Sequence, residues 1–205
     1  MSEKDHWEDV FRRRRPGQTS WYRPHLERSI TFIEQAGIEK DAAIIDIGGG
    51  ESTLVDDLLD RGYSDLTVLD ISSTAIASAK ARLGRRAASV TWIEEDITLA
   101  RLPEHRYHFW HDRAVFHFLV DVESRRRYVA AVGRGLRPGG HIVVATFGHS
   151  APEQCSGLDV VRYNTDELYG EFGRRFEKVS SCNEVHLTPW GSEQEFIYCY
   201  CRISE

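Results

Sequence analysis

Three aspartates are the first candidates for ligand-binding residues in this chain. Each lies at the end of a short apolar run: Asp46 in IIDI, Asp70 in LTVLD and Asp96 in VTWIEED. In an open sheet of parallel strands, ligands bind beyond the carboxyl ends of the strands. A carboxylate at such a place can accept hydrogen bonds from ribose hydroxyls or from the exocyclic amine of adenine. The spacing therefore predicts a nucleoside-containing ligand held by three strand tips.

Three consecutive glycines, Gly48, Gly49 and Gly50, follow the first of these runs. Glycines in a row favour a tight turn or a close approach of the backbone to a ligand. The dinucleotide fingerprint GxGxxG needs a third spaced glycine, which is absent here. Glu51 would repel a pyrophosphate at the helix N-terminus, where such an anion normally binds. These features disfavour a nicotinamide-dependent oxidoreductase and favour a ligand without phosphates.

Strands and helices alternate through most of the sequence. Five apolar runs have the length and composition of buried strands: residues 42–47, 66–71, 90–96, 107–112 and 141–147. Because parallel strands need crossover connections, the helical patterns between these runs predict a doubly wound α/β sheet. Two further strand-like runs, 176–187 and 195–203, are separated by turn-forming residues. They predict a C-terminal antiparallel hairpin at the edge of the sheet.

The composition bounds the class of protein. The formal net charge of −6 argues against a general nucleic-acid binder. No apolar run approaches the ~20 residues that a membrane span needs, and the N-terminus lacks the apolar centre of a signal peptide. We therefore expect a cytoplasmic protein with no membrane partner. Cys199 and Cys201 alternate along a strand without further zinc ligands nearby, so we expect reduced thiols and no metal site.

Four segments together resemble the successive motifs of class I S-adenosylmethionine-dependent methyltransferases. These segments are IIDIGGGES, LTVLDIS, EEDIT and LRPGGHIVVATF, and they extend from residue 44 to residue 147. The resemblance implies a seven-stranded, mostly parallel sheet with a reversed last strand. It also implies S-adenosylmethionine as the cofactor and S-adenosylhomocysteine as its product.

The resemblance also implies roles for residues around the methionine part of the cofactor. Asp46 and the glycine turn would border it, and Asp112, at the tip of YHFWHD, would lie near its amino group and the substrate. In a narrower group of small methyltransferases that this chain resembles, Trp21 would cover the cofactor. Ser52 stands where the family usually has the last glycine of its first motif, so the local turn is open to variation.

The adenosine part would be held by the next two strand tips. By the same resemblance, Asp70 would bind the ribose, with Ile71 beside the adenine. Asp96 would face the adenine amine, with Ile97 adjoining it.

We expect one domain, because residues 1–205 suit a single hydrophobic core. Its expected parts are a polar N-terminal arm or lid (1–20), an N-terminal helix (21–40), a cofactor-binding core (41–150) and a substrate loop with the edge hairpin (151–205). The run Arg12–Arg15 favours a solvated arm. A lid over the site, or a contact with an anionic substrate, is the alternative.

Methyl transfer is an in-line displacement, so the protein mainly aligns the acceptor with the methyl carbon. A base helps where the acceptor must lose a proton, and histidine suits that role near neutral pH. His117, close after Asp112, is the candidate base, and His149 is a second candidate. Loop packing is the alternative for both, and His186 in the edge hairpin is expected to be structural.

Several aromatic and thiol side chains offer further contacts with an acceptor. Phe116, Phe118 and Trp190 could wall its pocket, although we favour core or lid packing for each. Cys155 lies in an expected loop and could touch a soft acceptor such as a thiol. An incidental cysteine is the favoured interpretation.

The resulting functional hypothesis is methyl transfer to a small molecule, because the chain is compact and carries no added recognition domain. A protein-lysine methyltransferase is the main alternative, since some similar lysine enzymes are equally small. A non-catalytic cofactor-binding module and a nicotinamide-dependent oxidoreductase are less favoured. The sequence leaves open whether the protein is a monomer or a homodimer.

Overall fold

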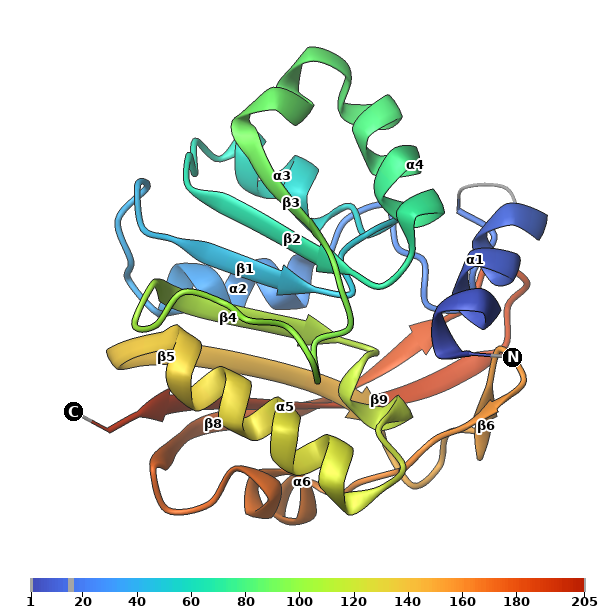
Figure 1. Ribbon diagram of the computed structural model, residues 1–205. Helices are drawn as coiled ribbons and strands as arrows, with labels where there is room; N and C mark the ends of the chain where they lie inside the picture. The colour runs from blue at the N-terminus through green and yellow to red at the C-terminus, as the bar shows by residue number, and fades with distance from the viewer. Residues whose placement is uncertain (1, 15–16, 205) are drawn as a thin grey trace.

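A seven-stranded sheet organises the computed structural model, which describes residues 2–14 and 17–204 (Figure 1). The strands lie in the order β3-β2-β1-β4-β5-β9-β8, and only β9 is antiparallel to its neighbours. They are β1 (Ile44–Ile47), β2 (Leu66–Asp70), β3 (Val90–Glu94), β4 (Tyr107–Arg113), β5 (Leu136–Phe147), β8 (Phe176–Leu187) and β9 (Glu193–Ile203). The predicted doubly wound sheet with a C-terminal edge hairpin is thus confirmed, including the reversed strand.

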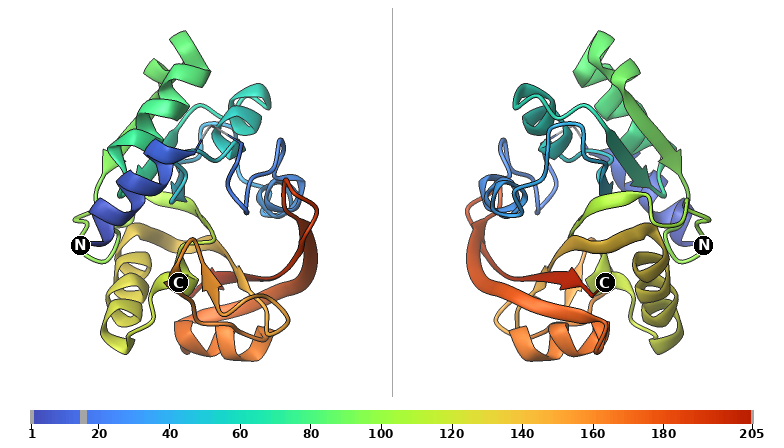
Figure 2. Two further views of the ribbon diagram at one scale, coloured as in Figure 1. Left: turned by 90° about the vertical axis from the view of Figure 1, so that its right-hand side faces the viewer. Right: turned by 90° about the vertical axis from the view of Figure 1, so that its left-hand side faces the viewer.

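Helices cover both faces of this sheet (Figure 2). One buried core joins the sheet to α2 (Glu27–Gln35), α3 (Leu54–Asp60) and the end of α4 (Ser73–Leu83). The other core joins it to α5 (Val122–Gly135) and α6 (Thr165–Phe172). Within the described residues, no helix has the length and apolar character needed to cross a membrane.

Several element boundaries differ from the predicted ones. Helix α2 begins at Glu27 rather than Trp21, because Pro24 disfavours helical backbone at the residue before it. Strand β5 begins at Leu136, ahead of the predicted run 141–147, and includes the Arg-Pro-Gly-Gly segment. The short elements η1 (Gly84–Ser89), η2 (Phe116–Phe118), β6 (Gln154–Cys155) and β7 (Leu158–Asp159) were not predicted, and neither was α6.

The N-terminal segment is a helix, α1 (Glu3–Arg13), and not the solvated arm that its charge favoured. Ser2 and Asp5 form a capping box at its start. Trp7 and Phe11, one turn apart, lie on the same side of α1, and both line a pocket at the carboxyl ends of the strands. The helix therefore has the position of the alternative, a lid. Arg12 and Arg13 are exposed at its end, and Arg15 lies outside the described residues.

Glu8 attaches this helix to the first turn of α4. Its carboxylate accepts hydrogen bonds from the backbone N–H of Ser73, at 2.7 Å, and from the Ser73 and Thr74 hydroxyls. Burial alone would raise the pKa of Glu8, but these hydrogen bonds outweigh it and lower the pKa to about 2. A negative charge at a helix N-terminus is also favourable.

We predict that acid releases α1 from α4. Because the pKa of Glu8 is lowered in the folded state, its contribution is complete above a pH of about 4.5 and is lost as the pH falls towards about 2. Glu8→Gln should reproduce this release at neutral pH and speed tryptic cleavage after Arg12 or Arg13 several-fold.

Asp9→Asn is the matched control, because Asp9 pairs with Arg13 inside the same helix. Its cleavage rate should stay near that of the unmodified protein. Equal cleavage of the two variants would show that Glu8 does not hold the helix. Tryptophan fluorescence, reporting on Trp7, should follow the acid transition in the unmodified protein but not in Glu8→Gln.

Candidate functional site

Two adjoining pockets open where the carboxyl ends of β1, β2 and β4 meet. Trp21, Ile47, Gly48 and Arg113 line both of them. Six predicted site residues line the first pocket: Trp21, Gly48, Asp70, Ile71, Asp96 and Ile97. The second pocket is lined by Asp46, Gly48 and Trp21 from that prediction, together with residues 51–53. The fold therefore brings the strand-tip acids to one cleft.

Steric crowding explains why glycine occupies both ends of the glycine turn, residues 48–50. Gly48 has φ +66°, and a Cβ there would overlap the side chain of Val115. A Cβ on Gly50 would lie 2.5 Å from the Cβ of Ala75 and 2.6 Å from a carboxylate oxygen of Asp70. The backbone can thus pass this close to its neighbours only without side chains.

Asp70 is the buried carboxylate of the first pocket. It accepts the backbone N–H of Gly50 at 2.9 Å and that of Ser72 at 2.8 Å, one on each oxygen. Burial raises its pKa to about 6, although these two hydrogen bonds oppose the shift. A carboxylate has about four acceptor sites, so both oxygens retain capacity for ribose hydroxyls.

Asp46 belongs to a buried chain of polar groups beside the second pocket. One of its oxygens lies 2.7 Å from Nδ1 of His111, whose Nε2 lies 2.8 Å from the Ser29 hydroxyl. The other oxygen has no hydrogen-bond partner, and the side chain of any residue replacing Gly49 would collide with it. This free acceptor suits a donor such as the amino group of the methionine part.

Asp96 lies at the mouth of the first pocket, two residues beyond β3. One oxygen accepts the N–H and the hydroxyl of Thr98, both at 2.8 Å. Ile71 and Ile97 line the same pocket, as the adenine site requires. Glu3 of α1 also lines it, and burial, then the charge of Asp96, raises the pKa of Glu3.

Neither pocket is lined by His117, the candidate base, or by Asp112, which was predicted to act beside the cofactor's amino group and the substrate. Asp112 points to the opposite face of the sheet from His111 and accepts the Tyr128 hydroxyl at 2.6 Å. His117 is fully buried, and its Nδ1 accepts the backbone N–H of Phe147 at 3.1 Å. Burial, and then the charge of Arg113, lower the pKa of His117 to about 3. The structure therefore separates both side chains from the cleft.

Arg113 reaches the cleft instead and was missed by the sequence analysis. It follows His111 by two positions in β4, so it shares the face of Asp46. Its Nε donates to the Tyr198 hydroxyl at 3.0 Å and its Nη1 to the Trp21 carbonyl at 2.9 Å. The same alternation that separates His111 from Asp112 could have predicted this placement.

The remaining candidates fall into different places. His149 is exposed and lies 2.8 Å from Glu167, and Trp190 is also exposed. Phe116 is in the core, whereas Phe118 lines the first pocket. His186 is buried and contacts the backbone carbonyl of Ser20 at 2.6 Å; Cys155 is buried, 3.8 Å from the Ser20 hydroxyl.

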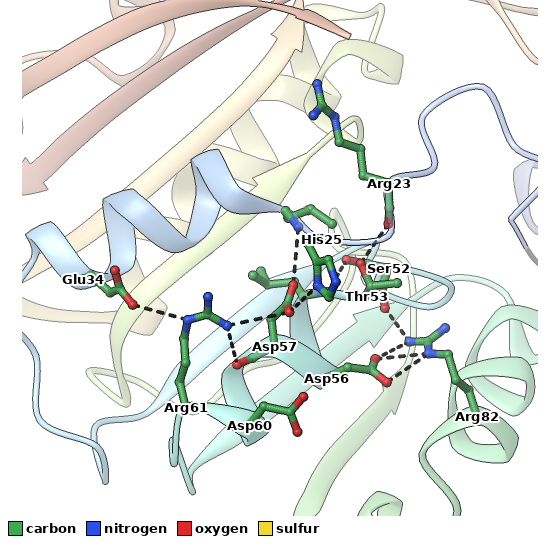
Figure 3. Close-up of polar contacts among 12 residues, drawn as sticks. Arg23, His25, Glu34, Ser52, Thr53, Asp56, Asp57, Asp60, Arg61 and Arg82 are labelled. Atoms are coloured by element: carbon green, nitrogen blue, oxygen red, sulfur yellow. Dashed lines mark hydrogen bonds and ion pairs between the residues drawn. The ribbon is translucent and has the colours of Figure 1, made fainter. Parts of the chain in front are cut away.

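A polar network holds the loop that borders the second pocket (Figure 3). Thr53 donates its hydroxyl to the Arg23 carbonyl at 2.9 Å, and the ring of His25 lies 2.8 Å from Asp57. Arg82 donates to the Ser52 carbonyl at 2.6 Å. The segment before α2 is thus fixed to the start of α3, which explains how Ser52 can replace the usual glycine in an ordered loop.

Comparisons with known proteins by sequence and by structure both find methyltransferases. A family model described as a methyltransferase domain matches residues 44–140. The chain is 28% identical over 165 residues to the eEF1A lysine and N-terminal methyltransferase of Mus musculus. The aligned region covers 73% of this chain and 23% of that protein. The chain therefore spans about a quarter of the length of that relative.

Two solved structures share the fold. One comes from work on the conversion of a disulfide bond into a thioacetal group during echinomycin biosynthesis; it has a TM-score of 0.78 and 18% identity and covers 99% of this chain and 93% of its own. The other is the 1,6-didemethyltoxoflavin-N1-methyltransferase of Burkholderia thailandensis, with bound 1,6-didemethyltoxoflavin and S-adenosylhomocysteine. It has a TM-score of 0.67 and 16% identity, and covers 88% of this chain and 78% of its own.

The sheet order, the strand-tip motifs and these matches define an S-adenosylmethionine-dependent methyltransferase. The family model and the fold likeness support the class I superfamily of these enzymes, with S-adenosylmethionine as the cofactor. The free acceptor of Asp46 and the side-chain-free glycine turn fit that cofactor, which carries an amino group and lacks phosphates.

We predict that Asp70→Ala weakens S-adenosylhomocysteine binding roughly tenfold or more, because a charged hydrogen bond contributes about 1.5–3 kcal/mol. Calorimetric titration measures this change. Affinity in the unmodified protein should rise as the pH passes upward through about 6, where the Asp70 carboxylate ionises. Asp65→Ala, at the start of the same strand, is the control, since Asp65 pairs only peripherally with Arg106. Unchanged affinity in Asp70→Ala would reject the ribose role.

We predict that Asp112→Asn lowers stability and leaves cofactor binding within about twofold. The Tyr128 hydroxyl donates to Asp112 and accepts from Trp110, so an amide there disturbs a buried network at a cost of about 1–3 kcal/mol. Thermal unfolding and titration with S-adenosylhomocysteine separate the two effects. A tenfold loss of binding without loss of stability would restore Asp112 to the cofactor site.

Proposed function

We propose that this methyltransferase transfers the methyl group to a small molecule and not to a protein lysine. The observation that carries the proposal is the character of the cleft beyond β4. The described residues that line it there are Arg113, Ala114, Val115, Phe118 and Leu119, and none of them is acidic. A lysine channel would be expected to offer carboxylates to the ammonium group, whereas Arg113 repels it.

The strand-tip acids of the cleft lie on the other side, where the cofactor is proposed to bind, and Glu3 of α1 interacts with both Asp96 and Asp121. Asp70 would accept the ribose hydroxyls and Asp96 the adenine amine, while Asp46 and the glycine turn would hold the methionine part. Bound S-adenosylmethionine supplies a methyl group already activated on its sulfonium. The chain's own task is then to orient the acceptor and to exclude water from it.

Aromatic side chains supply that orientation and exclusion. Trp7 of α1 contacts Phe118 at a ring-centroid distance of 4.9 Å and Trp21 at 5.9 Å, both edge to face. Phe11 contacts Trp21 from the same helix. These rings form a wall suited to a planar, apolar acceptor and remain coupled to the position of α1. Because Asp112 and His117 lie outside the pockets, the proposal assigns no general base to either.

The lysine alternative rests on the names of the sequence relatives, which include an eEF1A lysine and N-terminal methyltransferase. The small-molecule proposal is supported by the fold likeness to a structure with bound 1,6-didemethyltoxoflavin. Both likenesses are distant in sequence. The charge of the cleft beyond β4 is the feature of this chain that favours one over the other.

Methyl transfer from radiolabelled S-adenosylmethionine can separate the two functions. We predict that label enters the ultrafiltrate of a cell extract and not its protein fraction or purified elongation factor 1A. The Asp70→Ala variant should lose this transfer, whereas the Asp65→Ala control should retain it. Label confined to protein lysine would reject the small-molecule acceptor. Cofactor binding without any transfer would instead favour the non-catalytic module.

A further inference from the structure

Arg113 is a buried cation without a directly bonded anion. Its side chain is 8% exposed, and its hydrogen-bond partners are neutral: the Tyr198 hydroxyl and the Trp21 carbonyl. The guanidinium also lies 4.2 Å from the ring centroid of Phe196. Its Nη2 atom is buried and has no hydrogen-bond partner. Removing such a charge from water is costly unless an anion compensates it.

The nearest carboxylate of this network is already engaged elsewhere. Glu184 accepts the Tyr198 hydroxyl at 3.0 Å and pairs with Arg23 at 3.3 Å. It therefore reaches Arg113 only through the tyrosine. His186, which also faces this region, has its pKa lowered by burial and then by Arg113, so its ring is neutral near pH 7 and adds no charge to this network. The protein leaves one arm of the guanidinium available for an external anion.

The position of this arm points to the acceptor and not to the cofactor. The contacts of Arg113 with Phe196 and Tyr198 place the guanidinium beside β9, which lies on the other side of β4 from β2 and β3 in the sheet. Arg113 still lines the junction of the two pockets, beside Trp21. A group bound there would lie next to the aromatic wall.

His117 lies near Arg113 without compensating its charge. Its Nδ1 accepts the Phe147 N–H, so in the neutral ring the hydrogen is on Nε2. The ring is fully buried and lines neither pocket, and burial, then the charge of Arg113, keeps it neutral. The free Nη2 of Arg113 is therefore the donor that a bound carboxylate would meet, in a charge-assisted hydrogen bond.

We propose that Arg113 recognises the carboxylate of a small aromatic acceptor. The proposal rests on the proposed small-molecule transfer and names its substrate class. The guanidinium holds the anion, and the rings of Trp7, Trp21 and Phe118 enclose the planar part. Arg113 is then a specificity-determining residue, because a neutral analogue leaves its charge uncompensated.

The same carboxylate chemistry could come from the methionine end of the cofactor, so the experiment separates the two sources. Calorimetry on the complex with S-adenosylhomocysteine would compare benzoate, salicylate, 4-hydroxybenzoate and indole-3-acetate with their matching amides. We expect at least one acid to bind roughly tenfold more tightly than its amide. Arg113→Met should abolish this preference while changing S-adenosylhomocysteine affinity less than about twofold.

Two further variants control for folding and for surface charge. Arg113→Lys retains the charge and should keep part of the preference, whereas Arg106→Met removes an arginine just before the same strand and should keep all of it. The comparison of acids with amides uses the unmodified protein, so it tests carboxylate recognition even if Arg113→Met does not fold. Equal binding of every pair, or no binding of any probe, overturns the proposal.

A different result identifies the cofactor as the source. If Arg113→Met weakens S-adenosylhomocysteine binding tenfold but leaves 5′-methylthioadenosine unaffected, the arginine binds the methionine carboxylate and the acceptor assignment is wrong. These outcomes are distinct from failure of the proposed function. That failure would appear as label on protein lysine in the transfer experiment, whatever the probes bind.

Discussion

One buried carboxylate, that of Asp70, joins the parts of the site. It accepts an N–H from Gly50, in the turn after β1, and another from Ser72, at the N-cap of α4. Burial raises its pKa to about 6, so these two hydrogen bonds are what keep the carboxylate charged near neutral pH. A side chain on Gly50 would enter the space of Asp70 and Ala75. The turn, the helix start and the Asp70 carboxylate therefore form one unit.

The N-terminal helix attaches to that same unit. Ser72 bonds to Asp70, while the next two residues, Ser73 and Thr74, bond to Glu8 of α1. One turn of α4 thus contacts the Asp70 carboxylate on one side and α1 on the other. Helix α1, which brings Trp7 to the first pocket, is attached one residue beyond the one that bonds to Asp70, so movement of α1 is mechanically linked to the position of Asp70.

The fold was predictable because parallel strands are continuous apolar runs whose tips carry the acids, and this pattern fixes the order of motifs without side-chain detail. The side chains that face the cleft beside β4 were not predictable in the same way. Asp112 and Arg113 are adjacent in β4, so their side chains point to opposite faces of the sheet, one toward Tyr128 and the other toward the cleft. Only the contact of Asp46 with His111 shows which of the two faces borders the cleft. Helix α1 was hidden for another reason, since its charged composition conceals two aromatic residues one turn apart.

The charges of the cleft are sorted along the strand order. Acids lie at the tips of β1, β2 and beyond β3, where the predicted binding mode places hydroxyl and amine donors of the cofactor, and the buried arginine lies at the tip of β4. A bound sulfonium would place a further positive charge near their junction. An ammonium acceptor would then meet two cations across the aromatic wall, with no carboxylate among the described lining residues beyond β4 to offset them. An acceptor with a negative charge is drawn to the same place, because it lowers the electrostatic cost of both cations at once.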